Sequence, residues 1–372
     1  MRLKQHIMMI QIVTFCILLC STGYARSPSG LQWKILGDIS ARYDHTQANA
    51  PSFILGDIDL WFQNQFTERW SGLGEIMVMD MSEEGEPMYH VHPARLFLKY
   101  VWNDAFQLRI GQMHTPIGFY SQFYPHGARF YEPTIHRPLL GRVEHGKELL
   151  SLHTVGIMVQ GKQSYGTAID LQYTFGVGNG GAHGGIDTNA WKTPYFHVRL
   201  LPLAIEGLTL AVSGYFDEID MDHASHHATE EHDLDSIKQV ITNASIFYDV
   251  YPFELLIETF LIRHADHFFG GGHSTASESL TEHDHMNPTQ LFGGYVQALY
   301  HWNDHSIFLL FESFERDQED VILNRHTPYV KYWGMSWGYR QYLNQNVLLK
   351  VGHKYSWSDD LHSFDLQLAY QL

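Results

Sequence analysis

The sequence predicts an all-β fold, a closed antiparallel transmembrane β-barrel of about 16 strands. From residue 31 onward, short segments of alternating apolar and polar residues follow one another, and the connections between them are alternately short and long. Charged residues make up only 17 % of the chain and aromatic residues 14 %. After residue 25 no apolar run is long enough for a spanning helix. Only helices and closed barrels satisfy every backbone polar group in a bilayer, so a membrane-bound chain of this kind must be a barrel.

The N-terminus is typical of a secretory signal peptide, which we predict over residues 1–25. Arg2 and Lys4 precede an apolar run from Ile7 to Leu19, and small residues follow it. A membrane anchor is the alternative, but this run is shorter than the roughly 20 residues that a spanning helix needs. Both cysteines lie in the signal, so the remaining single domain, residues 26–372, has no disulfide chemistry.

The alternation predicts the strands in chain order, with the last one showing the pattern most clearly. Phe364, Leu366 and Leu368 share one face of that segment, and Asp365 and Gln367 share the other. The expected strands are 31–44, 53–66, 70–81, 90–101, 105–112, 150–161, 165–176, 192–203, 207–217, 238–249, 252–264, 290–302, 305–315, 327–341, 345–357 and 360–372.

A soluble β-sandwich also alternates along its strands and is the alternative fold. Trp and Tyr at many strand ends, such as Trp70, Trp102 and Trp333, favour the barrel, because aromatic girdles mark the two membrane interfaces. The connections after even-numbered strands are short. Because short turns face the periplasm in outer-membrane barrels, we expect both termini in the periplasm and the long loops outside.

One stretch carries a family resemblance. Gly111-Gln112 ends a strand, and Thr115-Pro116-Ile117-Gly118 opens the long connection after it. This stretch resembles the bacterial outer-membrane porin superfamily, which includes general porins and phosphate-selective porin O/P-like proteins. The resemblance implies that residues 113–146 fold into the lumen as a constriction loop, that the protein lies in the bacterial outer membrane, and that it forms a homotrimer.

The predicted constriction loop is rich in aromatic residues, whose apolar area favours docking on the inner wall. Its charged and histidine side chains are candidates for a transverse field across the pore, although they can equally pair with one another or with the wall. The candidates are Arg129, Glu132, Arg137, Arg142, Glu144, His126 and His136.

The pleat predicts which charged residues line the lumen, since apolar residues face lipid. The candidates are Lys34, Arg42, Asp57, Asp59, Arg95, Lys99, Arg109, Arg199, Glu258, Glu312 and Lys350. Both signs occur, and no dominant ladder of Arg and Lys stands out. The formal net charge of −17 favours a bulk preference for cations.

Histidine is abundant, with 25 residues, and two predicted extracellular loops, 217–237 and 264–290, combine it with Asp and Glu. Imidazole beside carboxylate suits weak binding of Zn, Cu or Ni ions, while solvated or pH-responsive loops are the alternative. The candidate ligands are His223, His226, His227, His232, His283 and His285.

The sequence therefore predicts a porin, a water-filled channel for passive diffusion of small hydrophilic solutes or ions. The alternative function is a surface receptor or uptake channel for transition-metal ions or complexes, which would use the His-rich loops. No hydrolase signature is present, so we expect no enzymatic activity. The expected partners are outer-membrane lipid and small solutes. We expect no cofactor and no nucleic-acid partner.

Overall fold

A computed structural model describes residues 30–45, 52–80, 89–124, 129–141, 149–180, 191–220, 236–265, 287–320 and 322–372. The predicted signal peptide lies outside these residues. Two short helices, α2 (Tyr120–Phe123) and α4 (Leu323–His326), and the 3-10 turn η1 (Leu139–Gly141) accompany the strands. Across the described ranges, no helix has the length and apolar character needed to cross a membrane.

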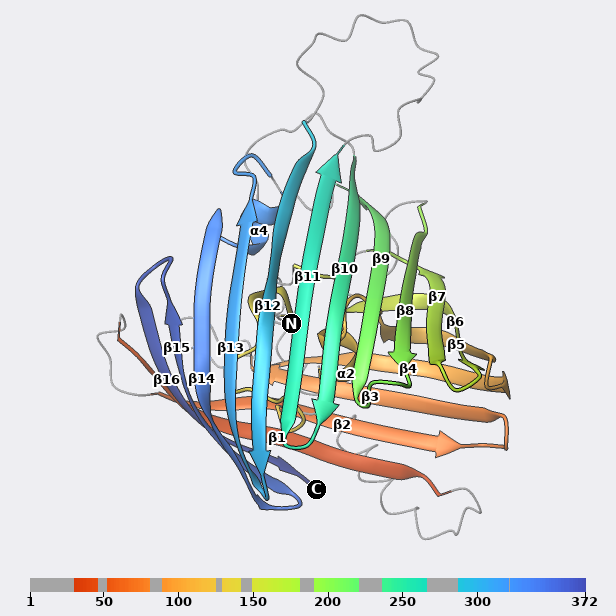
Figure 1. The fold of residues 1–372 in the computed structure, drawn as a ribbon, viewed down its shortest axis with the longest axis horizontal. Helices are drawn as coiled ribbons and strands as arrows, with labels where there is room; N and C mark the ends of the chain where they lie inside the picture. Colours follow the sequence, from red (N-terminus) through yellow and green to blue (C-terminus); the bar gives the residue numbers. More distant parts are fainter. Residues whose placement is uncertain are drawn as a thin grey trace, which may run out of the picture.

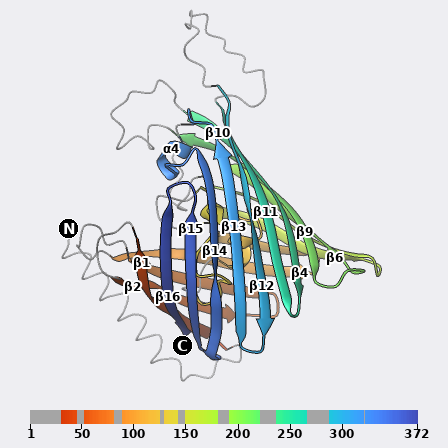
Figure 2. The ribbon, with the colours of Figure 1, turned by 60° about the vertical axis from the view of Figure 1, so that its left-hand side comes forward.

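The described residues form one closed barrel of 16 antiparallel strands, which confirms the predicted fold. Each strand pairs with its neighbours in sequence, and β16 pairs with β1 to close the ring. Figure 1 shows the near wall crossing the far wall at a steep angle, because all the strands tilt relative to the barrel axis. Figure 2 shows β16 beside β1. The strands are β1 (Gln32–Asp44), β2 (Ser52–Gln65), β3 (Trp70–Asp80), β4 (Tyr89–Asn103), β5 (Phe106–His114), β6 (His153–Tyr165), β7 (Ile169–Gly178), β8 (Thr193–Pro202), β9 (Leu208–Asp220), β10 (Ser236–Val250), β11 (Phe253–Ala265), β12 (Thr289–Trp302), β13 (His305–Arg316), β14 (Lys331–Asn344), β15 (Val347–Ser356) and β16 (Leu361–Gln371).

The pleat separates an apolar outer surface from a polar inner one. In β16, Phe364 on the outer face is 52 % exposed, whereas its neighbour Asp365 on the inner face is 3 % exposed. The same division holds for Leu366 and Leu368 against Gln367. An apolar exterior with a polar interior is the arrangement that lets a strand barrel sit in lipid.

Strand β7 begins four residues later than the sequence predicts, because Tyr165 still belongs to β6 and a turn follows it. Two strands that follow long connections also begin later, by three residues in β6 and four in β14. The residues before β6 stay in the long connection, where Leu149, Leu150 and Leu152 are buried. The residues before β14 wrap the end of β13 instead, because the Arg316 guanidinium donates hydrogen bonds to their backbone carbonyls. In both places, tertiary contacts engage backbone N–H and C=O groups that would otherwise form ladder hydrogen bonds in a longer strand.

Candidate solute passage

The described residues of the connection between β5 and β6 fold into the barrel, as predicted, and we call residues 115–124, 129–141 and 149–152 the inward loop. Its two ends meet where the Thr115 N–H donates to the Leu152 carbonyl oxygen at 2.8 Å. Between these ends the loop crosses to β11, β13, β15 and β16, on the other side of the lumen.

Glu258 on β11 holds the first part of the inward loop. Its carboxylate is fully buried and accepts the backbone N–H of Phe119 at 2.6 Å and that of Tyr120 at 3.0 Å. Ser245 and Tyr295 also donate to it. Gly118 makes the approach possible: its φ is +76°, and a Cβ there would lie 2.7 Å from a Glu258 oxygen. Glu258 therefore serves as an anchor for the backbone of the loop.

The second part of the inward loop is held by β13, β15 and β16. The Leu139 N–H donates to Glu312 Oε2 at 2.5 Å, and Lys350 Nζ donates to the Arg129 carbonyl oxygen at 2.5 Å. His136 Nε2 is hydrogen-bonded to Asp365 Oδ2 at 2.7 Å. The wall charges at these points thus meet polar groups of the loop.

Three charged residues of the inward loop pair with one another. Both oxygens of buried Glu132 are engaged, Oε1 by Arg137 Nη2 at 2.5 Å and Oε2 by Arg129 Nη1 at 3.3 Å. Burial raises the pKa of Glu132, but the two guanidinium groups outweigh it and leave that pKa below its ordinary value. Burial likewise lowers the pKa of Arg137, but Glu132 more than compensates and raises it overall. This cluster is a largely buried network in which two guanidinium groups surround one carboxylate, so one formal positive charge is left over.

Several candidate residues fall outside the described ranges. These are His126, Arg142 and Glu144 of the loop, and all six candidate metal ligands, His223, His226, His227, His232, His283 and His285. Within the described part of the chain, no three His, Cys, Asp or Glu side chains come together as ligands of one metal ion.

The wall candidates divide into two groups by position. Those on β1, β11, β13 and β15 lie against the inward loop or its anchors: Lys34 donates to Tyr131, and Arg42 pairs with Asp365 at 2.6 Å. Glu258, Glu312 and Lys350 belong with them. Asp57 and fully buried Asp59 lie on β2. The second group lies on β4, β5 and β8 and consists of Arg95, Lys99, Arg109 and Arg199.

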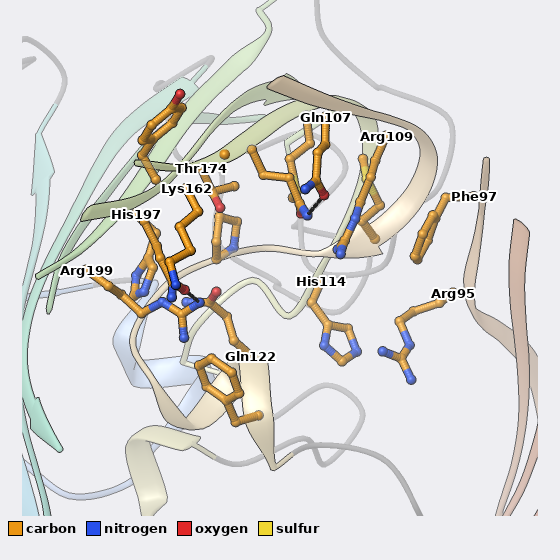
Figure 3. A pocket seen from close by; sticks show the side chains of 18 residues that line it. Arg95, Phe97, Gln107, Arg109, His114, Gln122, Lys162, Thr174, His197 and Arg199 are labelled. Atoms are coloured by element: carbon orange, nitrogen blue, oxygen red, sulfur yellow. Dashed lines mark hydrogen bonds between the residues drawn. The ribbon is translucent and has the colours of Figure 1, made fainter. Parts of the chain in front are cut away.

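Three members of the second group, Arg95, Arg109 and Arg199, line a cavity of about 350 Å³ between the start of the inward loop and the wall from β4 to β8. Figure 3 shows the labelled basic side chains around this common space. Its four cationic residues are Arg95, Arg109, Lys162 and Arg199. None of the described residues that line it is Asp or Glu. This cavity, which we call the cationic passage, has a surface of one charge sign.

Two of these cations have no acidic partner in the part of the chain that the structure describes. No carboxylate of the described residues lies within 4 Å of Arg109 or Arg199, whereas Arg95 pairs with Glu75 and Lys162 with Asp170. Arg109 lies over the Phe97 ring with its Cζ 5.0 Å from the centroid, and Arg199 lies 4.9 Å from that of Phe123. Stacking on an aromatic face orients a guanidinium while leaving its charge uncompensated.

The strand register explains why these cations gather. Lys99 lies directly opposite Arg109 on β4 and β5, and Lys162, Gln172 and Arg199 form one row across β6, β7 and β8. The sequence reasoning missed Lys162 and the four glutamines of the passage, Gln107, Gln122, Gln160 and Gln172. Alternation along a strand puts Gln107 on the same face as Arg109, and Gln160 on the same face as Lys162. The sequence pattern could therefore have identified Gln107, Gln160 and Lys162 as facing the lumen.

Comparison with known proteins gives a match in fold. No protein-family model matches the chain, and no curated protein matches its sequence. Salmonella typhi OmpF in complex with daunomycin is 12 % identical with a TM-score of 0.61, over 92 % of this chain and 98 % of that one. An anion-selective porin from Comamonas acidovorans is 9 % identical with a TM-score of 0.59, over 92 % of this chain and 100 % of that one.

A third similar structure is the trimer form of OmpT, an outer membrane protein of Vibrio cholerae. It is 8 % identical with a TM-score of 0.56, over 92 % of this chain and 99 % of that one. The three matches cover almost the whole length of each protein at low identity. The chain therefore has the fold of the bacterial outer-membrane porins.

Proposed function

We propose that this protein is an outer-membrane channel through which small anions diffuse passively, by way of the cationic passage. The observation that carries the proposal is the lining of that passage, whose described residues include four cationic side chains and no carboxylate. A low-dielectric wall of one charge sign concentrates ions of the opposite sign. The anion preference replaces the preference for cations expected from the net charge, because charges at the passage act on a passing solute more strongly than charges on distant loops.

The mechanism needs no chemical step and no cofactor. The barrel replaces lipid with a polar interior, and the inward loop limits the size of the solute. Arg109 and Arg199 attract the anion, while amide side chains such as Gln107 and Gln160 exchange hydrogen bonds with it as it sheds water. The anion loses only part of its hydration shell when it contacts the arginines. It is therefore bound weakly enough to enter and to leave.

The direct test is the reversal potential of purified channels in planar bilayers under a salt gradient. We expect chloride to permeate in preference to potassium. The double variant Arg109→Gln/Arg199→Gln should reduce that preference by about tenfold, since two uncompensated charges are removed from the passage. Lys331→Gln is the matched control, because Lys331 pairs with Glu315 and both side chains are exposed. A cation preference in the wild type, or an unchanged ratio in the double variant, would contradict the proposal.

Location, orientation and assembly belong to the same proposal. We expect cleavage of the signal over residues 1–25, both termini in the periplasm, and a homotrimer. The trimer is supported by the OmpT trimer form among the similar structures. Chemical cross-linking in isolated outer membranes tests it, and a monomer at every cross-linker concentration would argue against it.

The alternative function, transition-metal uptake by the His-rich loops, stays a prediction that is tested separately. Titration of Zn²⁺ or Cu²⁺ into wild-type protein should reveal weak sites that disappear when residues 221–235 and 266–286 are replaced by short Gly-Ser linkers. Sites that survive both replacements would show that these loops are not the ligands.

A further inference from the structure

A patch of methionine and histidine side chains lies on the inner wall of β3 and β4. The sequence places Met77 and Met79 two residues apart on β3, and His90 and His92 two residues apart on β4. The register makes them two cross-strand pairs, with Met77 directly opposite His92 and Met79 directly opposite His90. Side chains directly opposite each other have Cβ atoms roughly 5 Å apart.

These four side chains face the lumen. Met77 and Met79 are buried, at 2 % and 8 % exposed, and pack with Ala94 in one cluster. His90 and His92 are only partly buried, and their ring centroids are 5.4 Å apart. The patch thus combines thioethers at its base with imidazoles that an ion in the lumen can reach.

The neighbouring strands extend the patch with chemistry that suits a cation. His114 and His153 lie directly opposite each other on β5 and β6, and His153 is 6.4 Å from His92 between ring centroids. On the other side, the buried carboxylate Asp59 of β2 lies directly opposite Met77. Asp59 places a carboxyl group beside the thioether of Met77.

The patch lies beside the cationic passage, toward the end of the barrel that carries the long connections. β3 runs toward the long connection after it and β4 runs away from that connection, so all four residues lie at the end of the barrel that carries the long connections. Arg95 follows His92 by three residues on β4, and His114 itself lines the passage (Figure 3).

We infer that Met77, Met79, His90 and His92 bind a soft, thiophilic metal ion of the Cu(I) or Ag(I) class. Thioether sulfur and imidazole nitrogen are ligands that select such ions, whereas Mg²⁺ and Ca²⁺ require oxygen ligands. Zn²⁺ prefers thiolate, imidazole and carboxylate and gains little from a thioether. The site is independent of the predicted His-rich loops, and it depends on the proposed channel only for access from outside.

The test uses Ag⁺ as a redox-stable probe, titrated calorimetrically into the full-length barrel in detergent and chloride-free buffer. Met77→Leu/Met79→Leu keeps the side-chain volume and removes both sulfurs. We expect it to weaken one Ag⁺ site by about tenfold or more, and we expect the same of His90→Gln/His92→Gln. Met335→Leu, on β14, is the matched control and should leave the site intact. The His-rich loops are present in every variant, so any binding to them is a constant background.

Two further measurements make each outcome decisive. Heat-modifiable migration on gels verifies that each variant is a folded barrel. Zn²⁺ titration should give the same isotherm for wild type and Met77→Leu/Met79→Leu. Equal Ag⁺ affinity in wild type and the methionine variant would overturn the inference, as would loss of Ag⁺ binding in the histidine variant alone. Conductance without silver reports on the proposed channel separately, so the two proposals can fail independently.

Discussion

The two sides of the barrel interior use the same kinds of residue for different purposes. On the side of β11 to β16, the inward-facing charges Glu258, Glu312 and Lys350 each hold backbone groups of the inward loop. On the side of β4 to β8, Arg109 and Arg199 rest on aromatic rings and have no carboxylate partner among the described residues. A lumen-facing charge is therefore structural where the loop covers it and available to a solute where the loop leaves it open.

The largest effect should come from removing the anchor on the packed side. Glu258→Ala leaves the N–H groups of Phe119 and Tyr120 and the Tyr295 hydroxyl without their acceptor in a buried site. We expect the free energy of unfolding, measured by urea titration in detergent, to fall by about 3–5 kcal/mol. The freed loop should also widen the pore and raise the single-channel conductance.

Glu315→Ala is the control for this variant. Glu315 pairs with Lys331 at 3.0 Å, but both side chains are more than half exposed. An exposed ion pair contributes about 0–1 kcal/mol, so stability and conductance should hardly change. If Glu258→Ala retained wild-type conductance, the loop would be held without Glu258, and the contrast between the two sides would be wrong.

The fold could be predicted from the sequence because the pleat makes each strand a local signal. The alternation of Phe364 to Gln367 reports the two faces of β16 without knowledge of any neighbour. The cationic passage could not be predicted in this way. Whether Arg109 meets a carboxylate depends on strand register and on the path of the inward loop, which bring together residues far apart in the chain.

The loop charges illustrate the same limit. Arg129, Glu132 and Arg137 suggested either a transverse field or mutual pairing, and the sequence favoured neither. The choice depends on burial: with Glu132 inaccessible to solvent, an unpaired carboxylate would be costly, so the two arginines close around it. Among the described residues, the charges that line the cationic passage are those of the wall.

A smaller effect should sharpen the comparison through pH. Burial lowers the pKa of His136, and its hydrogen bond to Asp365 only partly offsets this, so the ring is neutral at pH 7 in the folded barrel. The unfolded chain, with a histidine pKa of about 6.5, then binds more protons than the folded one as the pH falls below that value. This contribution to stability is therefore present above about pH 6.5 and is lost on acidification.

His136→Gln should remove this part of the pH dependence. Between about pH 7 and pH 5 the wild type should lose on the order of 1 kcal/mol more unfolding free energy than the variant. His301→Gln is the control, because that ring lies on β12 and is only partly buried. Equal losses in wild type and His136→Gln would mean that the ring does not stay neutral inside the docked loop.

The smallest effect concerns the boundary between the two sides, where Phe123 belongs to both. Its ring stacks on Phe119 of the packed side, with centroids 4.3 Å apart, and supports Arg199 of the cationic passage. Phe123→Leu keeps an apolar side chain but removes the aromatic face, which is worth about 0.5–1 kcal/mol at a partly exposed site. Arg199 should then sample more rotamers, so the chloride preference in bilayers should fall by about twofold while the conductance stays close to that of the wild type.

Phe253→Leu, at an exposed position on β11, is the matched control. A preference unchanged in Phe123→Leu would mean that Gln172, which accepts a hydrogen bond from Arg199, is sufficient to hold the guanidinium in place.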